Sequence, residues 1–278
     1  MKFAKMHGAG NDFILVDARG MERDWASLAR ALCHRHLGVG AAGLLLVVPS
    51  LQAALGMRMF NPDGSEAEAC GNGMRCFAKY AVEKGLVGGA AFPIETRAGL
   101  RQMKPRVRGG KVVSVQVTLG RPSFAPQSIP MRVEGELDII KDYPLMVGRR
   151  RLPITALSLG NPHAVHFWGR PVAEFPLSEL GPQVEHHPAF PQRVNFEVAR
   201  VLGPGRVEAR VWERGAGETM ACGSGAGAIA VAARLLGYGD GQVDITLPGG
   251  TLRVGWDGEG EVTLSGPAEF VFEGEWRE

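Results

Sequence analysis

The sequence has little of what marks membrane, secreted or nucleic-acid-binding proteins. No apolar run approaches about 18 residues, and the first seven residues, MKFAKMH, contain no apolar segment of a signal peptide. Arginine and lysine are scattered, and the formal net charge is only +2. Four cysteines without a signal peptide favour reduced thiols over a disulfide framework. We therefore expect a cytoplasmic enzyme with no nucleic-acid or membrane partner.

Asparagine is scarce as well. Asparagine tolerates turns and left-handed backbone, and this would be enough to explain any single one of them. The chain has only five, however, and all of them lie in segments that carry motifs. We therefore expect these positions to need an amide, and they are Asn11, Asn61, Asn72, Asn161 and Asn195.

Two kinds of site have weak support. No C-x-x-C pair is present, and His34 and His36 stand two apart in an expected helix, where they would point in different directions, so no metal site is predicted. The glycines of 223–227 and 71–73 resemble a dinucleotide loop. Neither completes G-x-G-x-x-G directly after an apolar strand, so a nicotinamide-dependent oxidoreductase is only an alternative.

One short motif occurs twice. Ala-Cys-Gly-Asn-Gly at 69–73 recurs as Ala-Cys-Gly-Ser-Gly at 221–225, and 222 − 70 gives an offset of 152. Collinear matches across both halves indicate a duplicated unit, and two repeats are too few for a solenoid. We expect two similar domains. Further matches are 10–13 with 160–163, at an offset of 150, and 58–61 with 210–213, at 152.

The hydrophobic pattern predicts many short strands and few helices. We expect helices from Asp24 to a stop at Gly38, over 74–84 and over 226–236. Many strands around one helix in each half favour a curved sheet around a central helix, with 120–130 as the crossover between halves. The expected strands are 14–17, 44–48, 57–60, 94–97, 112–119, 164–168, 196–201, 207–213, 243–247, 251–255, 262–264 and 270–272.

The two later helices differ in their charge pattern. Arg75, Lys79 and Glu83 follow one another at intervals of four, which predicts an amphipathic helix with a charged face. Residues 226–236 are apolar on nearly all sides until Arg234, which predicts a helix enclosed by the protein.

Cys70 and Cys222 each open one of these helices. The positive end of a helix and its free N–H groups favour a thiolate and can also receive a carboxylate. Two such thiols could remove a proton from one face of a carbon and return one to the other. Cys33 and Cys76 have no such context, and we expect them to be small buried hydrophobic residues.

The motif set resembles the diaminopimelate epimerase family. It comprises MHGAGNDF at 6–13, FNPDGSE at 60–66, both cysteine loops, GNPH at 160–163, RVN at 193–195, ERGAGET at 213–219 and LPGG at 247–250. The resemblance implies interconversion of LL- and meso-2,6-diaminopimelate, an amino-acid substrate, without a cofactor.

The resemblance also implies a fold. The family has two related α/β (α+β) domains, each a barrel-like, mostly antiparallel curved sheet wrapped around a central helix, with the active site in the cleft. The C-terminal segment returns to the first domain. We therefore expect one domain at 1–120 plus about 266–278 and another at 121–265. The resemblance leaves a homodimer open.

Site residues follow from the same resemblance, position by position. Cys70 and Cys222 match the two catalytic thiols, whose base and acid roles exchange with the direction of reaction. His163 and Glu213 match a pair that tunes the thiols and touches the reacting amine. The remaining matches bind the substrate. Gly71, Asn72, Gly223 and Ser224 hold the reacting carboxylate, and Asn11, Asn61, Asn161, Asn195 and Arg214 bind chiefly the distal end.

The residues give Arg214 independent support. Its counterpart in the first half is Pro62, so the repeat has no second cation here. A reacting carboxylate served by two helix ends leaves Arg214 to read a second carboxylate through bidentate bonds. The structural alternative is a surface ion pair between Arg214 and Glu218. One departure from the family is Ala42-Gly43, where relatives usually carry Asp followed by Gly or Gln.

Two further alternatives stay open. A proline or hydroxyproline racemase would share the two-thiol chemistry on a substrate with one carboxylate, which Arg214 and the asparagines oppose. A ligand-binding protein without catalysis would not need both Cys70 and Cys222.

Overall fold

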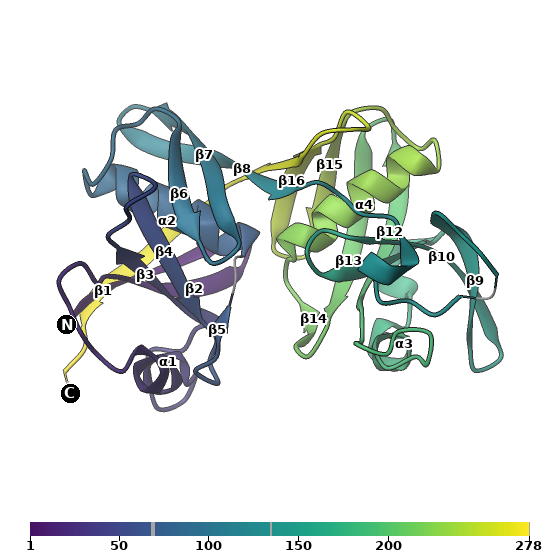
Figure 1. Ribbon diagram of the computed structural model, residues 1–278, viewed down its shortest axis with the longest axis horizontal. Helices are drawn as coiled ribbons and strands as arrows, with labels where there is room; N and C mark the ends of the chain where they lie inside the picture. The colour runs from purple at the N-terminus through teal and green to yellow at the C-terminus, as the bar shows by residue number, and fades with distance from the viewer. Residues whose placement is uncertain (68–69, 134, 278) are drawn as a thin grey trace. The chain divides into compact units, whose positions relative to one another are not determined.

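The chain passes twice between two units. The computed structural model describes residues 1–67, 70–133 and 135–277, so Ala69 of the first cysteine loop lies outside the described residues. The first unit comprises Met1–Thr118 and Ser265–Glu278, and the second comprises Leu119–Leu264. In each unit a mixed sheet curves around one helix (Figure 1).

The first unit pairs its strands in the order β18–β1–β2–β3–β4–β6–β7–β8, and of these described pairings β2–β3 and β4–β6 are parallel. The helix inside this sheet is α2 (Gly71–Glu83), which contacts β1, β2, β3 and β7, while α1 (Trp25–Cys33) packs on β3 and β4. The strands are β1 (Lys2–Gly8), β2 (Asn11–Asp17), β3 (Gly43–Val48), β4 (Leu55–Phe60), β5 (Glu66–Ala67), β6 (Phe92–Thr96), β7 (Gly99–Arg108), β8 (Lys111–Gly120) and β18 (Glu269–Glu275).

The second unit pairs its strands in the order β9–β10–β11–β12–β13–β15–β16, and among the pairings described here β11–β12 and β13–β15 are parallel. Here α4 (Gly223–Leu235) contacts β10, β11, β12, β15 and β16, and α3 (Leu177–Glu185) packs on β9, β12, β13 and β14. The remaining elements are β9 (Ile140–Val147), β10 (Arg150–Ser158), β11 (Pro162–Phe167), β12 (Asn195–Gly203), β13 (Arg206–Glu213), β14 (Gly217–Thr219), β15 (Gln242–Leu247), β16 (Gly250–Gly255), β17 (Val262–Gly266), and short 3₁₀ turns at Pro126–Ser128 and Val172–Glu174.

The two units repeat one another in register. Leu44 faces Phe60 across β3 and β4, and Phe196 faces Trp212 across β12 and β13, where 196 − 44 and 212 − 60 are both 152. Helices α1 and α3 are related by the same offset, because α1 begins at residue 25, α3 begins at residue 177, and 177 − 25 is also 152. The prediction of a mixed α/β fold with two pseudo-symmetric halves is confirmed. No helix among the residues that the structure describes is long and apolar enough to cross a membrane.

Helix α1 ends earlier than expected. Asp24 caps its start, with Oδ1 accepting the Ser27 N–H at 3.0 Å, as the sequence predicts. The helix ends at Cys33, however, and not at Gly38, because His34 is extended and its Nδ1 accepts the Leu37 N–H at 3.0 Å. His34 and His36 therefore lie outside the helix.

The charged face of α2 is not at the surface. Arg75 is fully buried and Lys79 is 6% exposed, so the helix has the expected charged face, but this face is buried inside the unit. The reason is that these groups have partners inside the unit. Lys79 Nζ lies 3.0 Å from Glu83 Oε1 and donates to the Val112 carbonyl at 2.7 Å, which satisfies both charges out of water.

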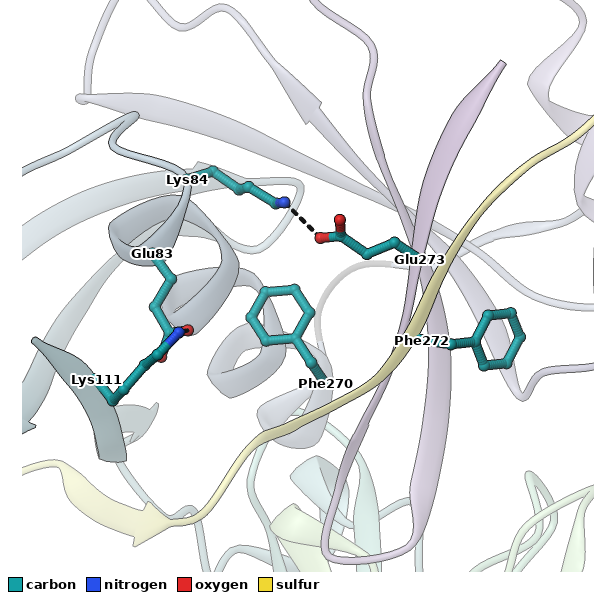
Figure 2. A pocket seen from close by; sticks show the side chains of 6 residues that line it. All are labelled: Glu83, Lys84, Lys111, Phe270, Phe272 and Glu273. Carbon is teal, nitrogen blue, oxygen red and sulfur yellow. Dashed lines mark hydrogen bonds and ion pairs between the residues drawn. The ribbon is translucent and has the colours of Figure 1, made fainter.

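A pocket of about 250 Å³ lies where β18 passes the C-terminal end of α2. Figure 2 shows the Phe270 ring beside two ion pairs, one between Lys84 and Glu273 and one between Lys111 and Glu83. Phe272 points away from Phe270 and meets the edge of Phe3, with ring centroids 6.0 Å apart.

The expected crossover at 120–130 belongs to the second unit. The unit boundary falls at Leu119, inside β8. Ser123 then pairs with Ser158, its N–H donating to the Ser158 carbonyl at 2.9 Å. This bridge ties the stretch after β8 to the end of β10.

Candidate active site

In the second unit Cys222 is the N-cap of α4 and is only 6% exposed. Its Sγ accepts the N–H of Gly225 at 3.4 Å and lies 3.5 Å from Ser224 Oγ. Gly223 forms the first residue of the helix and is buried. The sulfur thus lies where the free N–H groups of a helix end point, and this position stabilises negative charge.

A chain of polar contacts leads away from this thiol into the sheet. Ser224 Oγ accepts the Asn161 Nδ2–H at 3.2 Å, and Asn161 Oδ1 lies 3.0 Å from His163 Nε2. His163 Nδ1 lies 2.7 Å from Glu197 Oε1, and both side chains are fully buried. The structure therefore brings together Cys222, Ser224, Asn161 and His163 from α4 and β11.

Glu213 reaches the same thiol from β13. Thr219 donates its hydroxyl to Glu213 Oε1 at 2.5 Å, and the carboxyl group also hydrogen-bonds Cys222. Burial raises the pKa of Glu213, and the hydrogen bonds from Thr219 and Cys222 only partly oppose it.

The thiol of Cys222 is not acidified in this state. Burial, followed by the nearby carboxyl groups of Glu213 and Glu197, raises its pKa well above the ordinary value, and the bonds from Ser224 and Gly225 oppose this only in part. The expectation of a favoured thiolate from the helix end alone therefore does not hold here. A thiolate here would add a negative charge next to two buried carboxyl groups, which favours the protonated thiol.

Arg214 follows Glu213 in a loop that is held at three points. Its own N–H donates to Asn195 Oδ1 at 2.9 Å. Glu185 of α3 accepts the Gly215 N–H at 2.8 Å through Oε1 and the Trp212 Nε1–H at 2.8 Å through Oε2. The backbone on both sides of Arg214 is therefore fixed.

The side chain of Arg214 is exposed and donates to the Gln192 carbonyl at 3.2 Å. Glu218 is instead held by Arg210, with Nε–Oε1 at 2.7 Å and Nη2–Oε2 at 2.9 Å. The ion pair between Arg214 and Glu218 that competed with a substrate role is therefore not formed.

In the first unit Cys70 is the N-cap of α2, in extended conformation. Asn72 is 1% exposed, and its Oδ1 accepts a hydrogen bond from Arg75 Nη2 at 2.9 Å. Gly71 accepts a second bond from the same guanidinium, from Nη1 at 3.3 Å. Arg75 therefore stiffens the start of the helix from inside the unit.

The end of β1 closely approaches this helix start. A Cβ atom at Gly8 would stand 3.1 Å from the Asn72 carbonyl oxygen, and Gly8 pairs with Asn11 across β1 and β2. Asn11 therefore belongs to the same region as the Cys70 loop. Asn61 lies in the turn after β4, where its Nδ2 donates to Ser65 Oγ at 2.9 Å.

The segment Ala42-Gly43, where the sequence departs from the family, is held by the side chain of Asp12. Asp12 Oδ1 accepts the Ala42 N–H at 3.1 Å, and the carboxylate is also bound by Lys5 and Arg35. Burial raises the pKa of Asp12, but the bonds from Arg35 and Lys5 outweigh it and hold the pKa below the ordinary value. Ala42 therefore contributes its backbone to this loop.

The other two cysteines are buried, as expected. Burial raises the pKa of Cys33 to about 11 and that of Cys76 to about 12, so neither is a nucleophile near neutral pH. Among the described residues, no group of three or more His, Cys, Asp or Glu side chains could hold a metal ion.

Sequence reasoning missed three residues of the second unit. Glu197 looks like one position of a buried strand, Thr219 like part of a turn, and Glu185 lies in a helix that was not expected. The signal for Glu185 was present, since adding 152 to the first and last residue numbers of α1 gives those of α3. The sequence signal for Glu197 was weaker: it is a lone carboxylate that interrupts an apolar run in β12.

The solved structures that resemble the chain define its fold class. A phenazine biosynthesis protein of the PhzF family from Bacillus anthracis matches with a TM-score of 0.73 at 19% identity, over 100% of this chain and 99% of that one. A probable proline racemase from Agrobacterium radiobacter K84 matches with a TM-score of 0.73 at 18% identity, over 99% and 92%.

The sequence comparisons identify the family within that class. The diaminopimelate epimerase family matches residues 3–125 and 155–271. A diaminopimelate epimerase from Moorella thermoacetica is 48% identical over 281 residues, covering 99% of each chain. The chain belongs to the diaminopimelate epimerase family.

Proposed function

We propose that this chain interconverts LL- and meso-2,6-diaminopimelate by proton transfer at an α-carbon, with Cys70 and Cys222 as the two proton carriers. The observation that carries the proposal is the repeated thiol at a helix start. Cys70 caps α2 and Cys222 caps α4, at matching positions of two units with the same strand order. Inversion at carbon needs one proton removed from one face and one delivered to the other, hence two carriers.

The raised pKa of Cys222 suits one of these roles. A protonated thiol is ready to give its proton to a carbanion, while a thiolate removes one, and the roles exchange when the reaction runs backwards. In this proposal Glu213 and His163 tune the thiol. Glu213 does so directly through its hydrogen bond, and His163 through Asn161 and Ser224.

In this proposal the reacting carboxylate of the substrate binds at the N-terminal ends of α2 and α4. The N–H groups of Gly71 and Asn72, and those of Gly223 and Ser224, are suited to a carboxylate, and positive helix ends stabilise charge that develops on the adjacent α-carbon. These residues provide acid, base and anion stabilisation. The proposal therefore calls on no cofactor.

The far end of the substrate is assigned to the remaining polar residues. Arg214 would bind the second carboxylate through two bonds, since Glu218 does not occupy it. Asn195 would contribute indirectly because it fixes the Arg214 backbone. Asn11, Asn61 and Asn161 would bind the distal amine and carboxylate with their amides.

The decisive assay uses purified chain, LL-diaminopimelate and no added cofactor, in deuterated water. We expect formation of the meso isomer together with deuterium at the α-carbon, measured by proton NMR. Proline in place of diaminopimelate is the matched control, because the fold is shared with a probable proline racemase. Turnover of proline but not of diaminopimelate would replace the proposal with the racemase alternative.

Two broader properties complete the proposal. We place the chain in the cytoplasm, in keeping with its membership of a biosynthetic family. We also propose a homodimer, supported by two exposed apolar side chains of β18, Val271 at 54% and Phe272 at 47%. Phe272 also lines the pocket of Figure 2. Sedimentation of wild type and Phe272→Glu tests this, since a charge at the interface should yield monomers.

A further inference from the structure

The polar pair formed by His163 and Glu197 has an apolar counterpart in the first unit. Glu197 matches Leu45, because 197 − 45 is 152, and His163 matches Phe13, because 163 − 13 is 150, as the strand registers require. Phe13 and Leu45 are both fully buried, and so are His163 and Glu197. The same position in the same fold is thus filled once by two hydrophobic side chains and once by an acid and a base.

The match extends to the central helix. A Cβ atom at Gly73 would meet Leu45 Cδ2 at 3.3 Å, and a Cβ atom at the matching Gly225 would meet Glu197 Oε1 at 2.9 Å. Both side chains therefore pack against the third residue of the helix that a proposed catalytic cysteine opens. Leucine suffices for packing there, so packing alone does not explain a carboxylate.

Two buried charges need a reason other than stability. An acid and a base that are withdrawn from water lose hydration that their mutual attraction often fails to recover, and an apolar pair of similar size serves as well or better. Glu197 also has one carboxylate oxygen, Oε2, for which no hydrogen-bond partner exists among the described residues. The unit therefore carries an unfavourable group beside its thiol.

The hydrogen bonds of His163 indicate what this group does. Nδ1 faces the Glu197 carboxylate at 2.7 Å and Nε2 faces Asn161 Oδ1 at 3.0 Å, so both ring nitrogens face oxygen acceptors. A ring that donates from both nitrogens is an imidazolium. Asn161 then has its Nδ2 free to donate to Ser224, which leaves the Ser224 hydroxyl hydrogen for Cys222 Sγ.

From this geometry, and resting on the proposed function, we propose that Glu197 is a positioning residue that keeps His163 doubly protonated and so sets the direction of every hydrogen bond from His163 to Cys222. The chain of donors then ends on the sulfur and stabilises the thiolate when it forms. The charge of His163 also offsets part of the effect of Glu197 on Cys222, and of the two carboxyl groups Glu213 has the larger effect on the thiol.

The protonation state of His163 can be read without any activity assay. Nitrogen-15 NMR of histidine-labelled protein separates imidazolium from neutral imidazole, and His163→Gln identifies the signal among the seven histidines. We expect an imidazolium in wild type at pH 7.5 and a neutral ring in Glu197→Gln. A neutral His163 in wild type, or an unchanged signal in the variant, would overturn the proposal.

The kinetic consequence has its own matched control. Glu197→Gln should lower kcat roughly 10- to 100-fold with little change in KM. It should also move the alkaline limb of the kcat profile to lower pH, because without the Glu197 carboxylate the His163 ring loses its second proton, and with it the chain of donors to Cys222, at a lower pH. Glu208→Gln removes a carboxylate of β13 that pairs with Arg200 at 3.3 Å and should leave this profile in place. A purely structural Glu197 would change thermal stability and leave the pH profile where it is.

A double variant separates packing from chemistry. Replacing His163 with Phe and Glu197 with Leu copies the first unit, so the protein should fold with unchanged or higher melting temperature and lose turnover. Loss of folding would show that the pair is structural and would contradict the proposal. If wild type itself fails to epimerise diaminopimelate, the proposed function is wrong. The NMR measurement still tests the protonation state of His163 independently of that activity.

Discussion

Arg210 holds Glu218 with two parallel hydrogen bonds, Nε–Oε1 at 2.7 Å and Nη2–Oε2 at 2.9 Å. In the first unit Arg58 and Glu66, at the matching positions, form the same pair at 2.7 and 3.1 Å. Each pair joins a long strand to the short strand that leads into a cysteine loop. The duplicated pair is thus a structural device, and Arg214, whose counterpart is Pro62, is left for another task.

The first prediction concerns the two thiols. Cys70→Ala and Cys222→Ala should each abolish epimerisation, because each removes one of two proton carriers, while Cys33→Ala should keep near wild-type turnover. The assay is formation of the meso isomer from LL-diaminopimelate. Cys33→Ala controls for loss of a buried thiol, with a stability cost of about 1 kcal/mol from lost packing. Substantial turnover in either of the first two variants would contradict two-carrier chemistry.

The second prediction concerns the charge around Cys222. Burial and, after it, the Glu213 carboxyl group raise the pKa of the Cys222 thiol. Glu213→Gln should therefore lower that pKa, and the thiolate fraction at pH 8 should rise. Alkylation of the Cys222 peptide by iodoacetamide, followed by mass spectrometry from pH 7 to 10, measures this. The amide keeps the size of the side chain, so access is matched. Equal rates in both proteins across that range would show that Glu213 does not control the thiol.

Much of the fold could be predicted because its strands are either short apolar runs, as in β3, or alternate between apolar and polar residues, as in β13 and β17. The strand β7 was not predicted because most of its residues are exposed and only Met103 is buried, so the sequence shows no apolar face. Helix α3 was not predicted because it contains Gly181 and Pro182, two residue types that disfavour a helix. Gly181 is needed there, since a Cβ atom would stand 2.5 Å from the Trp212 ring.

The sequence predicted only part of the candidate site, because some of its residues come together only when distant strands pair. The repeat alone singled out Cys70 and Cys222, since both cap helices in matching loops. It could not show the raised pKa of Cys222, because that shift comes first from burial in the folded unit and then from carboxyl groups of β12 and β13, which are distant in the sequence. Glu197 looks like a strand residue until the parallel pairing of β11 and β12 places it beside His163.

A third prediction concerns acid stability. Burial lowers the pKa of His166, whose Nδ1 hydrogen-bonds the Pro153 carbonyl at 2.8 Å. The folded protein therefore favours the neutral ring. This stabilisation is complete above the ordinary pKa of 6.5 and is lost as pH falls from there through the lower folded pKa.

Urea unfolding at pH 7.5 and 5.0 measures the effect. Wild type should lose free energy of unfolding by at most about 1.4 kcal/mol per pH unit from this group. His166→Phe should be less stable at both pH values, since the Pro153 carbonyl loses its partner, but should show a smaller difference between them. His36→Gln, at an exposed position, serves as the control and should keep the wild-type difference.

The last prediction tests Arg214 through substrate choice. If its guanidinium binds the second carboxylate, Arg214→Ala leaves that charge without a partner and should cost about 2–4 kcal/mol in kcat/KM for diaminopimelate. Arg214→Lys should recover only part of this, because an ammonium cannot make two parallel bonds. Lysine, which is diaminopimelate without one carboxylate, should react poorly with wild type and lose little more in the alanine variant.

The two substrates and the two proteins form a cycle whose coupling energy isolates the contact between Arg214 and the carboxylate. Arg210→Ala is the matched control, because it removes a guanidinium that is already paired with Glu218. Arg210→Ala should lower kcat/KM for diaminopimelate and for lysine by the same factor. If Arg214→Ala likewise penalised diaminopimelate and lysine by the same factor, Arg214 would be structural, and recognition of a substrate with two carboxylates would have to reside elsewhere.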